Sequence, residues 1–219
     1  MSSIGSFLIL GGGSAGLIAA LTIRRLMPDV TVDLVRSQDI GVIGVGEGTT
    51  AVFPEHFFNV LGIPKEDFYR ETHPTWKQGI KFVWGPRDHF FYTFDFQYDQ
   101  KRPGMRLANG FYADEDCSLM DLPAALMQGD KAFATGPLGK PLISGQYAFH
   151  IENENLVRYL EKVAAKNGVE MHDDTLDHAV REGDEVTELV FKSGARRTAD
   201  LVIDASGFRA ELIGKTLGE

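Results

Sequence analysis

The sequence predicts an α/β fold built on a parallel sheet, because its first part alternates strand and helix patterns. Residues 4–10 are a short apolar run typical of a buried strand, and residues 14–27 have the pattern of a helix. Residues 30–35, VTVDLV, form a second β-rich run. Two strands separated by one helix indicate a parallel pair joined by a crossover helix.

A glycine cluster separates the first strand from the first helix. It fits the pattern G-x-G-x-x-G at Gly11, Gly13 and Gly16. In this pattern the first glycine permits a tight turn, the second lets the backbone approach a pyrophosphate, and the third lets the helix pack on the strand. The helix N-terminus then faces the anion. The cluster therefore predicts a Rossmann-like dinucleotide-binding domain, and the alternative is a glycine-rich turn without a ligand.

The second strand ends at a basic residue. Many nucleotide-binding proteins have an acidic residue there, which holds the ribose hydroxyls. Here the position is Arg36, with Asp33 inside the strand and Asp39 beyond it. Arg36 could favour a phosphate-bearing cofactor, cover an adenine, or lie at a solvated strand end.

The middle of the chain is less regular. A glycine-punctuated loop at 41–50 precedes a predicted helix at 50–64. Residues 76–84 have the pattern of a strand, and the aromatic-rich residues 88–98 also resemble one. Residues 99–146 are irregular and rich in glycine and proline, which favours an insertion near a binding site.

The last third returns to regular patterns. An amphipathic helix is predicted over 152–166. Short strands are predicted at 176–181, 186–191 and 198–204, with turns between them. We interpret these strands as a three-stranded meander whose last strand ends in VIDASG.

Composition limits the partners and the compartment. With 22 basic and 31 acidic residues the net charge is −9, which argues against nucleic acid or an anionic membrane as partner. Cys117 is the single cysteine, so the chain forms no internal disulfide and a reducing compartment is expected. The N-terminus lacks the basic and apolar regions of a signal peptide, and no apolar stretch approaches a membrane span. We expect a soluble cytoplasmic protein.

Several motifs together resemble one enzyme family. They are, in chain order, GGGSAG, IGVGEGTTAVFPEHFFNVLGIP, WKQGIKF, YAFHIENENLVRYL and DASGFRAELIGKTLG. This ordered set resembles the flavin-dependent tryptophan halogenases. The resemblance implies an FAD-binding domain of the flavin-monooxygenase type over residues 1–219, with an inserted substrate-side segment at 85–146. It also implies reduced FAD from a separate flavin reductase, molecular oxygen, and a chloride or bromide as co-substrate.

The resemblance also implies which residues bind FAD. The pyrophosphate would lie on Gly11, Gly13, Ser14, Ala15 and Gly16. The family does not always place an acidic residue at the end of the second strand, so Arg36 is kept among the cofactor residues. Leu176 would lie beside the adenine through its backbone, and Asp204 and Gly207 belong to a late motif in which a strand ends against the cofactor. From the residues alone, that motif is only a strand end followed by a helix N-cap.

Residues 43–49 resemble the family's strap between the flavin and substrate compartments. The strap residues assigned to the cofactor are Ile43, Val45, Gly46 and Glu47. Glu47 could be a carboxylate near the flavin or could cap the helix that is predicted to begin near Thr50.

Lys77, in WKQGIKF, matches the family's catalytic lysine. Without the family, it shares a face of the predicted strand with Lys81, and Gly79 between them suggests open space beside it. The resemblance implies that Lys77 hydrogen-bonds hypohalous acid, or becomes a haloamine, and presents the halogen to one ring carbon. Burial would suit either role because it lowers the pKa of the amine.

The predicted substrate residues depart from the family. Tyr92 and Phe94 stand where tryptophan halogenases have a histidine and a phenylalanine around the indole. Aromatic stacking is kept, so we expect tryptophan, an indole or another electron-rich aromatic as substrate. Phe94 could instead belong to the core. An aromatic hydroxylase with the same FAD domain, or a non-catalytic FAD-binding module, remains an alternative.

Three further expectations concern what lies outside this pattern. The family chain continues past the equivalent of Glu219, so its C-terminal half is expected to be missing here, and the aromatic segment at 90–96 is expected to leave an exposed apolar patch.

No metal site is predicted: the histidines lack ligand spacing, and the nearest cluster lies on an apparent surface turn. Its members are His172, Asp173, Asp174 and His178. The chain could act alone or as a homodimer.

Overall fold

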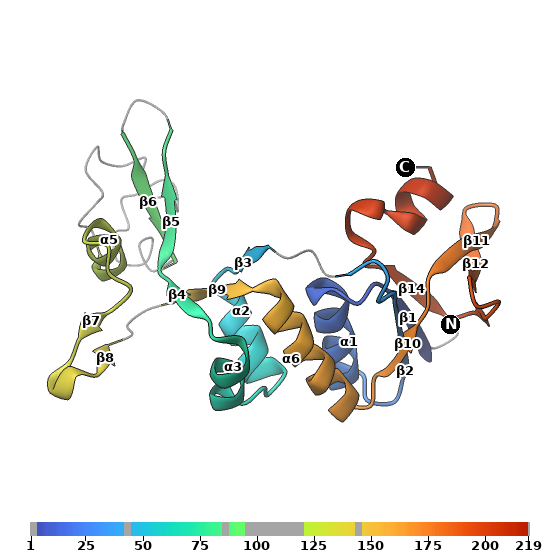
Figure 1. Ribbon diagram of the computed structural model, residues 1–219, viewed down its shortest axis with the longest axis horizontal. Helices are drawn as coiled ribbons and strands as arrows, with labels where there is room; N and C mark the ends of the chain where they lie inside the picture. The colour runs from blue at the N-terminus through green and yellow to red at the C-terminus, as the bar shows by residue number, and fades with distance from the viewer. Residues whose placement is uncertain (1–3, 42–44, 85–87, 95–120, 143–145, 219) are drawn as a thin grey trace. The chain divides into compact units, whose positions relative to one another are not determined.

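The computed structural model describes residues 4–41, 45–84, 88–94, 121–142 and 146–218. It divides into two compact units, shown in Figure 1, which are described separately below. The first unit comprises residues 1–45, 60–72 and 152–219, and the second comprises residues 46–59 and 73–151.

The first unit is built on a parallel sheet. Its order, among the described residues, is β10-β2-β1-β14, and every neighbouring pair is parallel. The strands are β1 (Ser6–Leu10), β2 (Thr31–Arg36), β10 (Glu170–Asp173) and β14 (Leu201–Asp204). The helices of this unit are α1 (Ser14–Leu26), α3 (Lys65–Thr72) and α6 (Asn153–Lys166), with the short η4 (Gly207–Arg209) and the π-helical η5 (Glu211–Thr216). The predicted α/β fold with a parallel sheet is confirmed.

Helices and a second sheet cover opposite faces of this sheet (Figure 1). The second sheet is antiparallel, in the order β11-β12-β13, and its strands are β11 (Leu176–Glu182), β12 (Glu185–Phe191) and β13 (Arg196–Arg197). Leu8, Val35 and Phe191 are buried in the core between the sheets. Because side chains alternate along a strand, Val32 and Leu34 face the other way, toward the helices.

The third predicted strand of the meander is divided between two sheets. Residues 196–197 complete the antiparallel sheet, whereas Leu201–Asp204 pairs in parallel with β1. The interpretation of 198–204 as the third meander strand is therefore wrong. Its apolar residues have partners in β1 that are distant in sequence, and no local pattern identifies them.

The second unit consists of short elements. Its strands are β3 (Gly46–Gly48), β4 (Thr75–Lys77), β5 (Gly79–Phe82), β6 (Phe90–Thr93), β7 (Ala134–Thr135), β8 (Pro141–Leu142) and β9 (Ala148–Glu152), whose last residue belongs to the first unit. Its helical elements are α2 (Val52–Pro54), η1 (Glu55–Val60), α5 (Leu122–Gln128) and η3 (Pro137–Gly139). In the described part of this unit, β3, β9 and β4 form one sheet, while β5–β6 and β7–β8 form separate pairs.

Two predicted elements of the second unit differ from the structure. The predicted helix at 50–64 is α2 followed by a π-helical segment, and Pro54, which has no N–H to donate, stands where they join. The predicted strand at 76–84 is interrupted at Gln78, so Lys77 and Lys81 belong to different sheets rather than to one strand face.

The aromatic segment is more buried than expected. Phe90, Phe91 and Phe94 are 7%, 9% and 2% exposed, so the prediction of an open aromatic patch is wrong for these residues. Phe96 lies outside the described residues. Large exposed apolar side chains occur instead at Val83 and Trp84.

Candidate functional site

The three glycines of the predicted phosphate loop have different surroundings. Gly11 has a φ of +126°, and a Cβ there would lie 2.1 Å from the Ala205 carbonyl oxygen. A Cβ on Gly16 would lie 2.0 Å from the Gly11 carbonyl oxygen. Gly13 differs, because a Cβ there would meet no described heavy atom within 4 Å. Gly11 and Gly16 are therefore required by packing, whereas the space beside Gly13 is open.

The glycine loop lies at the carboxyl edge of the parallel sheet, where ligands bind in open α/β folds. The Gly11 amide donates to the Val35 carbonyl (2.8 Å), and the Ala205 amide donates to the Leu10 carbonyl (2.8 Å). The adjacent ends of β2 and β14 are thereby held beside the loop. At the start of α1, the N-cap Gly13 provides no side-chain cap.

Arg36 lies over the loop rather than free in solvent. A Cβ on Gly12 would lie 2.5 Å from the Cβ of Arg36, so the two residues are in close contact. The Arg36 guanidinium forms an ion pair with Glu161 at 2.9 Å. Its side chain is 28% exposed, so the alternative of a solvated strand end is not what the structure has.

Asp204 organises the segment that follows β14. Its carboxylate accepts hydrogen bonds from the Ser206 amide (3.0 Å) and hydroxyl (2.5 Å) and from the Leu212 amide (2.8 Å). Burial raises the pKa of Asp204, but these hydrogen bonds outweigh it and hold the pKa below its usual value. Asp204 is therefore a structural cap of η5, in line with the strand-end and N-cap reading of DASG.

Two further predicted cofactor residues, Leu176 and Gly207, lie in the first unit. Leu176 is the first residue of β11, and its partly buried side chain packs against the core between the two sheets. Gly207 is exposed and has a φ of +64°, a conformation that favours glycine.

Part of the predicted strap forms an edge strand of the second unit. Ile43 lies outside the described residues, and Val45 is 53% exposed. Gly46 begins β3, in which Glu47 is half-buried. The Thr49 amide donates to the Phe149 carbonyl (2.9 Å), and the Phe149 amide donates to the Thr49 hydroxyl (2.9 Å), so the strap is tied to β9.

The Lys77 amine is held in a partly buried position. Its Nζ donates to the Thr49 carbonyl oxygen (3.0 Å) and lies 5.4 Å from the centre of the Phe94 ring. Burial lowers the pKa of Lys77. Lys81 is exposed on β5. The structure thus distinguishes the two lysines, which the sequence pattern alone placed on one strand face.

Of the two predicted substrate residues, Phe94 lies near the Lys77 amine. Tyr92 is half-buried on β6 opposite Ile80. Phe94 is 2% exposed, so it is part of the core as well as a neighbour of the amine. Gly79 does not keep space open: a Cβ there would lie 2.3 Å from the Tyr92 carbonyl oxygen. The interpretation of Gly79 as a spacer beside Lys77 is therefore wrong.

The structure also brings together residues that the sequence does not connect. A Cβ on Gly48 would lie 3.3 Å from Lys77 Nζ and 3.7 Å from His150 Nδ1. His150 was not singled out from the sequence, because more than 70 residues separate it from Lys77. Only the pairing of β4 with β9 makes them neighbours.

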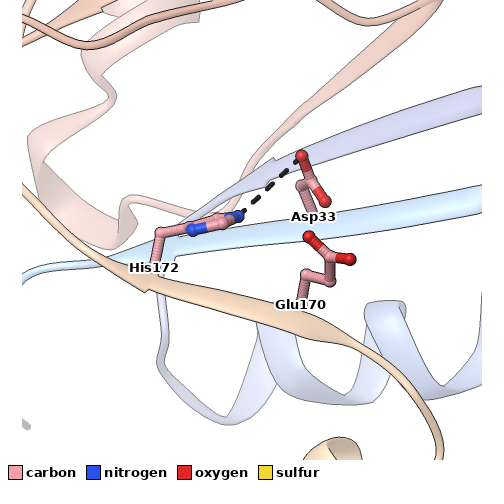
Figure 2. Close-up of side chains that lie close together, drawn as sticks. All are labelled: Asp33, Glu170 and His172. Carbon is pink, nitrogen blue, oxygen red and sulfur yellow. Dashed lines mark ion pairs between the residues drawn. The ribbon is translucent and has the colours of Figure 1, made fainter.

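A cluster of titratable groups lies within the first unit. Figure 2 shows Asp33 on β2 facing His172 and Glu170 on β10, and the three can place ligand atoms within 4.8 Å of one another. His172 Nε2 is 3.9 Å and Arg197 Nη1 is 3.6 Å from the same Asp33 oxygen. The placement of His172 on a surface turn is therefore wrong. Since Arg197 already compensates the Asp33 charge, we assign no metal to this cluster.

Among the described residues, no helix has both the length and the apolar character needed to cross a membrane.

Comparisons with known proteins agree on one family. The family model described as tryptophan halogenase matches residues 6–219. Tryptophan 7-halogenase RebH of Lentzea aerocolonigenes is 28% identical over 247 residues, covering 99% of this chain and 45% of RebH. The chain spans slightly less than half the length of the curated relatives it matches.

Solved structures give the same result. The structure of MibH, a tryptophan 5-halogenase, matches with a TM-score of 0.78 and 34% identity, over 99% of this chain and 42% of MibH. A flavin-dependent halogenase from Xanthomonas campestris matches with a TM-score of 0.75 and 29% identity, over 99% of this chain and 45% of that one.

Proposed function

This chain belongs to the tryptophan halogenase family, and on that premise we propose that it acts in an FAD-dependent halogenase that uses reduced FAD, oxygen and halide. The substrate would be an electron-rich aromatic such as tryptophan or an indole. Reduced FAD would come from a separate flavin reductase. The observation that carries the proposal is the partly buried amine of Lys77, held by the Thr49 carbonyl beside the Phe94 ring.

The glycine loop fits the pyrophosphate of FAD. Of the three glycines in the G-x-G-x-x-G pattern, Gly13 is the one beside which an added Cβ meets open space, and this is where the backbone would approach a phosphate. The first turn of α1 then offers its amides and the positive end of its dipole to the anion. Arg36, packed on Gly12, would add a positive charge at the same edge. We assign the pyrophosphate to Gly11, Gly13, Ser14, Ala15 and Gly16.

Lys77 would guide the halogen. Together with oxygen, bound reduced FAD would supply the oxidising power that converts a halide into hypohalous acid. An ammonium carries three donors, and the Thr49 carbonyl engages one of them. The remaining donors can hold the oxygen of hypohalous acid and so orient the halogen toward one ring carbon. Tyr92 and Phe94 would contribute aromatic surface at this site.

The test compares two lysine variants in the full-length protein, supplied with a flavin reductase, bromide and an aromatic substrate. We expect Lys77→Ala to lower the yield of brominated product by at least about 100-fold while FAD affinity is unchanged. Lys81→Ala is the matched control, because Lys81 is exposed on the neighbouring pair of strands, and it should retain activity.

The product distinguishes the alternatives. Brominated substrate, identified by mass spectrometry, supports the halogenase, whereas hydroxylated substrate in the presence of bromide supports an aromatic hydroxylase. Full halogenation by Lys77→Ala would remove Lys77 from the mechanism. No turnover by the wild-type protein would favour a non-catalytic FAD-binding module.

A further inference from the structure

His150 and Lys77 share one face of the β3-β9-β4 sheet. In the antiparallel pair of β4 and β9, Lys77 is opposite Ala148, and Thr75 is opposite His150. Opposite residues lie on the same face, so Lys77 and His150 are diagonal neighbours on that face. Diagonal neighbours are within reach of each other when the side chains are long.

The polar ends of both side chains converge on the bare backbone of Gly48. The position of a Cβ on Gly48 lies 3.3 Å from the amine of Lys77 and 3.7 Å from Nδ1 of His150. A larger residue at 48 would therefore displace one of the two groups. The Thr49 carbonyl oxygen also accepts a hydrogen bond from the amine. The Lys77 amine thus lies near the Thr49 carbonyl, the backbone of Gly48 and the imidazole of His150.

Charge couples the two groups. Burial, and after it the charge of Lys77, lower the pKa of His150. His150 is exposed as a residue, so the burial of its ring is partial. Two strands of the same sheet carry the neighbouring side chains. On β4 these are Lys77 and Thr75, which does not titrate, and on β3 the titratable residue is Glu47, next to Gly48. The imidazole is consequently neutral at pH 7, and one ring nitrogen can accept a hydrogen bond.

We propose that His150 is a positioning residue for Lys77, whose neutral imidazole keeps the amine beside the Thr49 carbonyl and whose protonation drives the amine away from it. The catalytic part of this inference rests on the proposed function. The coupling of the two side chains is a property of the chain itself and can be measured without activity.

The first experiment measures the coupling directly. The pKa of His150 is determined by NMR titration of the isotope-labelled chain in the wild type, in Lys77→Met and in Lys81→Met. We expect Lys77→Met to raise the pKa of His150, because it removes a nearby positive charge, and Lys81→Met to leave it unchanged. An unchanged His150 pKa in Lys77→Met would overturn the proposal, whatever the activity of the enzyme.

The second experiment measures the positioning role in the full-length protein. We expect His150→Leu to lower kcat for halogenation about 10- to 100-fold, with little change in KM for the aromatic substrate or in FAD affinity. His150→Asn keeps a short polar group without a titrating proton. It should recover most of kcat and lose the fall in activity that we expect of the wild type as pH drops through the lowered pKa of His150.

His89→Leu is the matched control, because His89 is a half-buried histidine of the same unit whose Nε2 hydrogen-bonds the Gln128 side-chain oxygen. It should leave kcat and the pH profile unchanged. A wild-type kcat and acid limb in His150→Leu would refute the positioning role. If the wild-type protein halogenates nothing, the proposed function fails, while the NMR titration still decides whether the pair exists.

Discussion

At the scale of single residues, the glycines of the phosphate loop differ in the space available for a side chain. Gly11 and Gly16 have no room for a side chain, because a Cβ on either would strike a backbone carbonyl. Gly13 has room, yet the sequence pattern gives all three the same status. The structure therefore distinguishes Gly11 and Gly16, which packing requires, from Gly13, which has open space beside it.

This difference predicts opposite outcomes for two glycine variants. Gly13→Val should change the free energy of unfolding by less than about 1 kcal/mol, since its side chain meets open space and its extended backbone suits valine. It should nevertheless abolish FAD binding in a fluorescence titration, because the side chain occupies the pyrophosphate position. Gly16→Ala should instead destabilise the protein by about 2–4 kcal/mol. Equal FAD affinity in Gly13→Val would refute the phosphate assignment.

At the scale of elements, the break at Gln78 decides which surroundings each lysine has. The Phe94 amide donates to the Gln78 carbonyl (3.1 Å), and the chain then continues into the β5–β6 pair. Lys77 therefore faces β9 and the strap, while Lys81 lies on a two-stranded pair and is exposed. An alternating pattern from 76 to 84 contains no signal for this change of partner.

The close approach of β5 and β6 can be tested at Gly79. Gly79→Ala should destabilise the strand pair by about 2–4 kcal/mol, because its Cβ would lie 2.3 Å from the Tyr92 carbonyl oxygen. Gly46→Ala is the matched control in the same unit, as a Cβ there meets no described atom within 4 Å. Amide hydrogen exchange of residues 79–82 and 90–93 reports the difference. Unchanged protection in Gly79→Ala would contradict the prediction, because it would mean that the strand pair accommodates the Cβ without being weakened.

At the scale of the whole molecule, two kinds of interaction stabilise the first unit, an apolar core and hydrogen-bonded carboxylates. The first unit has a continuous core between two sheets and helices packed on the parallel sheet. It also depends on carboxylates: Asp204 caps η5, and Asp200 accepts from the Gly5 and Ser6 amides (2.8 and 3.0 Å). Hydrogen bonds from those amides and from the Ser6 hydroxyl lower the pKa of Asp200.

These carboxylates predict how stability depends on pH. The folded-state pKa of Asp204 lies below the ordinary aspartate value of 3.8, so the contribution of Asp204 to stability is complete above pH 3.8 and is lost as pH falls through the folded-state pKa. Urea unfolding followed between pH 7 and pH 2 should show this loss in the wild type. Asp204→Asn should be less stable by about 1–3 kcal/mol at pH 7 and should lose less on acidification. Parallel pH curves for both proteins would contradict the capping role.

Much of the first unit was predictable because its signals are local. The apolar run, the glycine spacing and the helix pattern each depend on neighbouring residues. The structure accordingly has β1 (Ser6–Leu10) and α1 (Ser14–Leu26), with the glycine loop between them. Short elements were harder. β10, of four residues, has little apolar pattern, so His172 was placed on a turn instead of in the sheet.

By itself the sequence determined the α/β class, the position of the glycine loop and, through its ordered motifs, the family. Only the tertiary structure decided which glycine faces open space, that Asp204 caps a helix, and that Lys77 meets Thr49, Phe94 and His150. The physical reason is that these contacts join residues far apart in the chain. Local patterns specify strands and helices, but the register of β4 on β9 places an imidazole beside an amine.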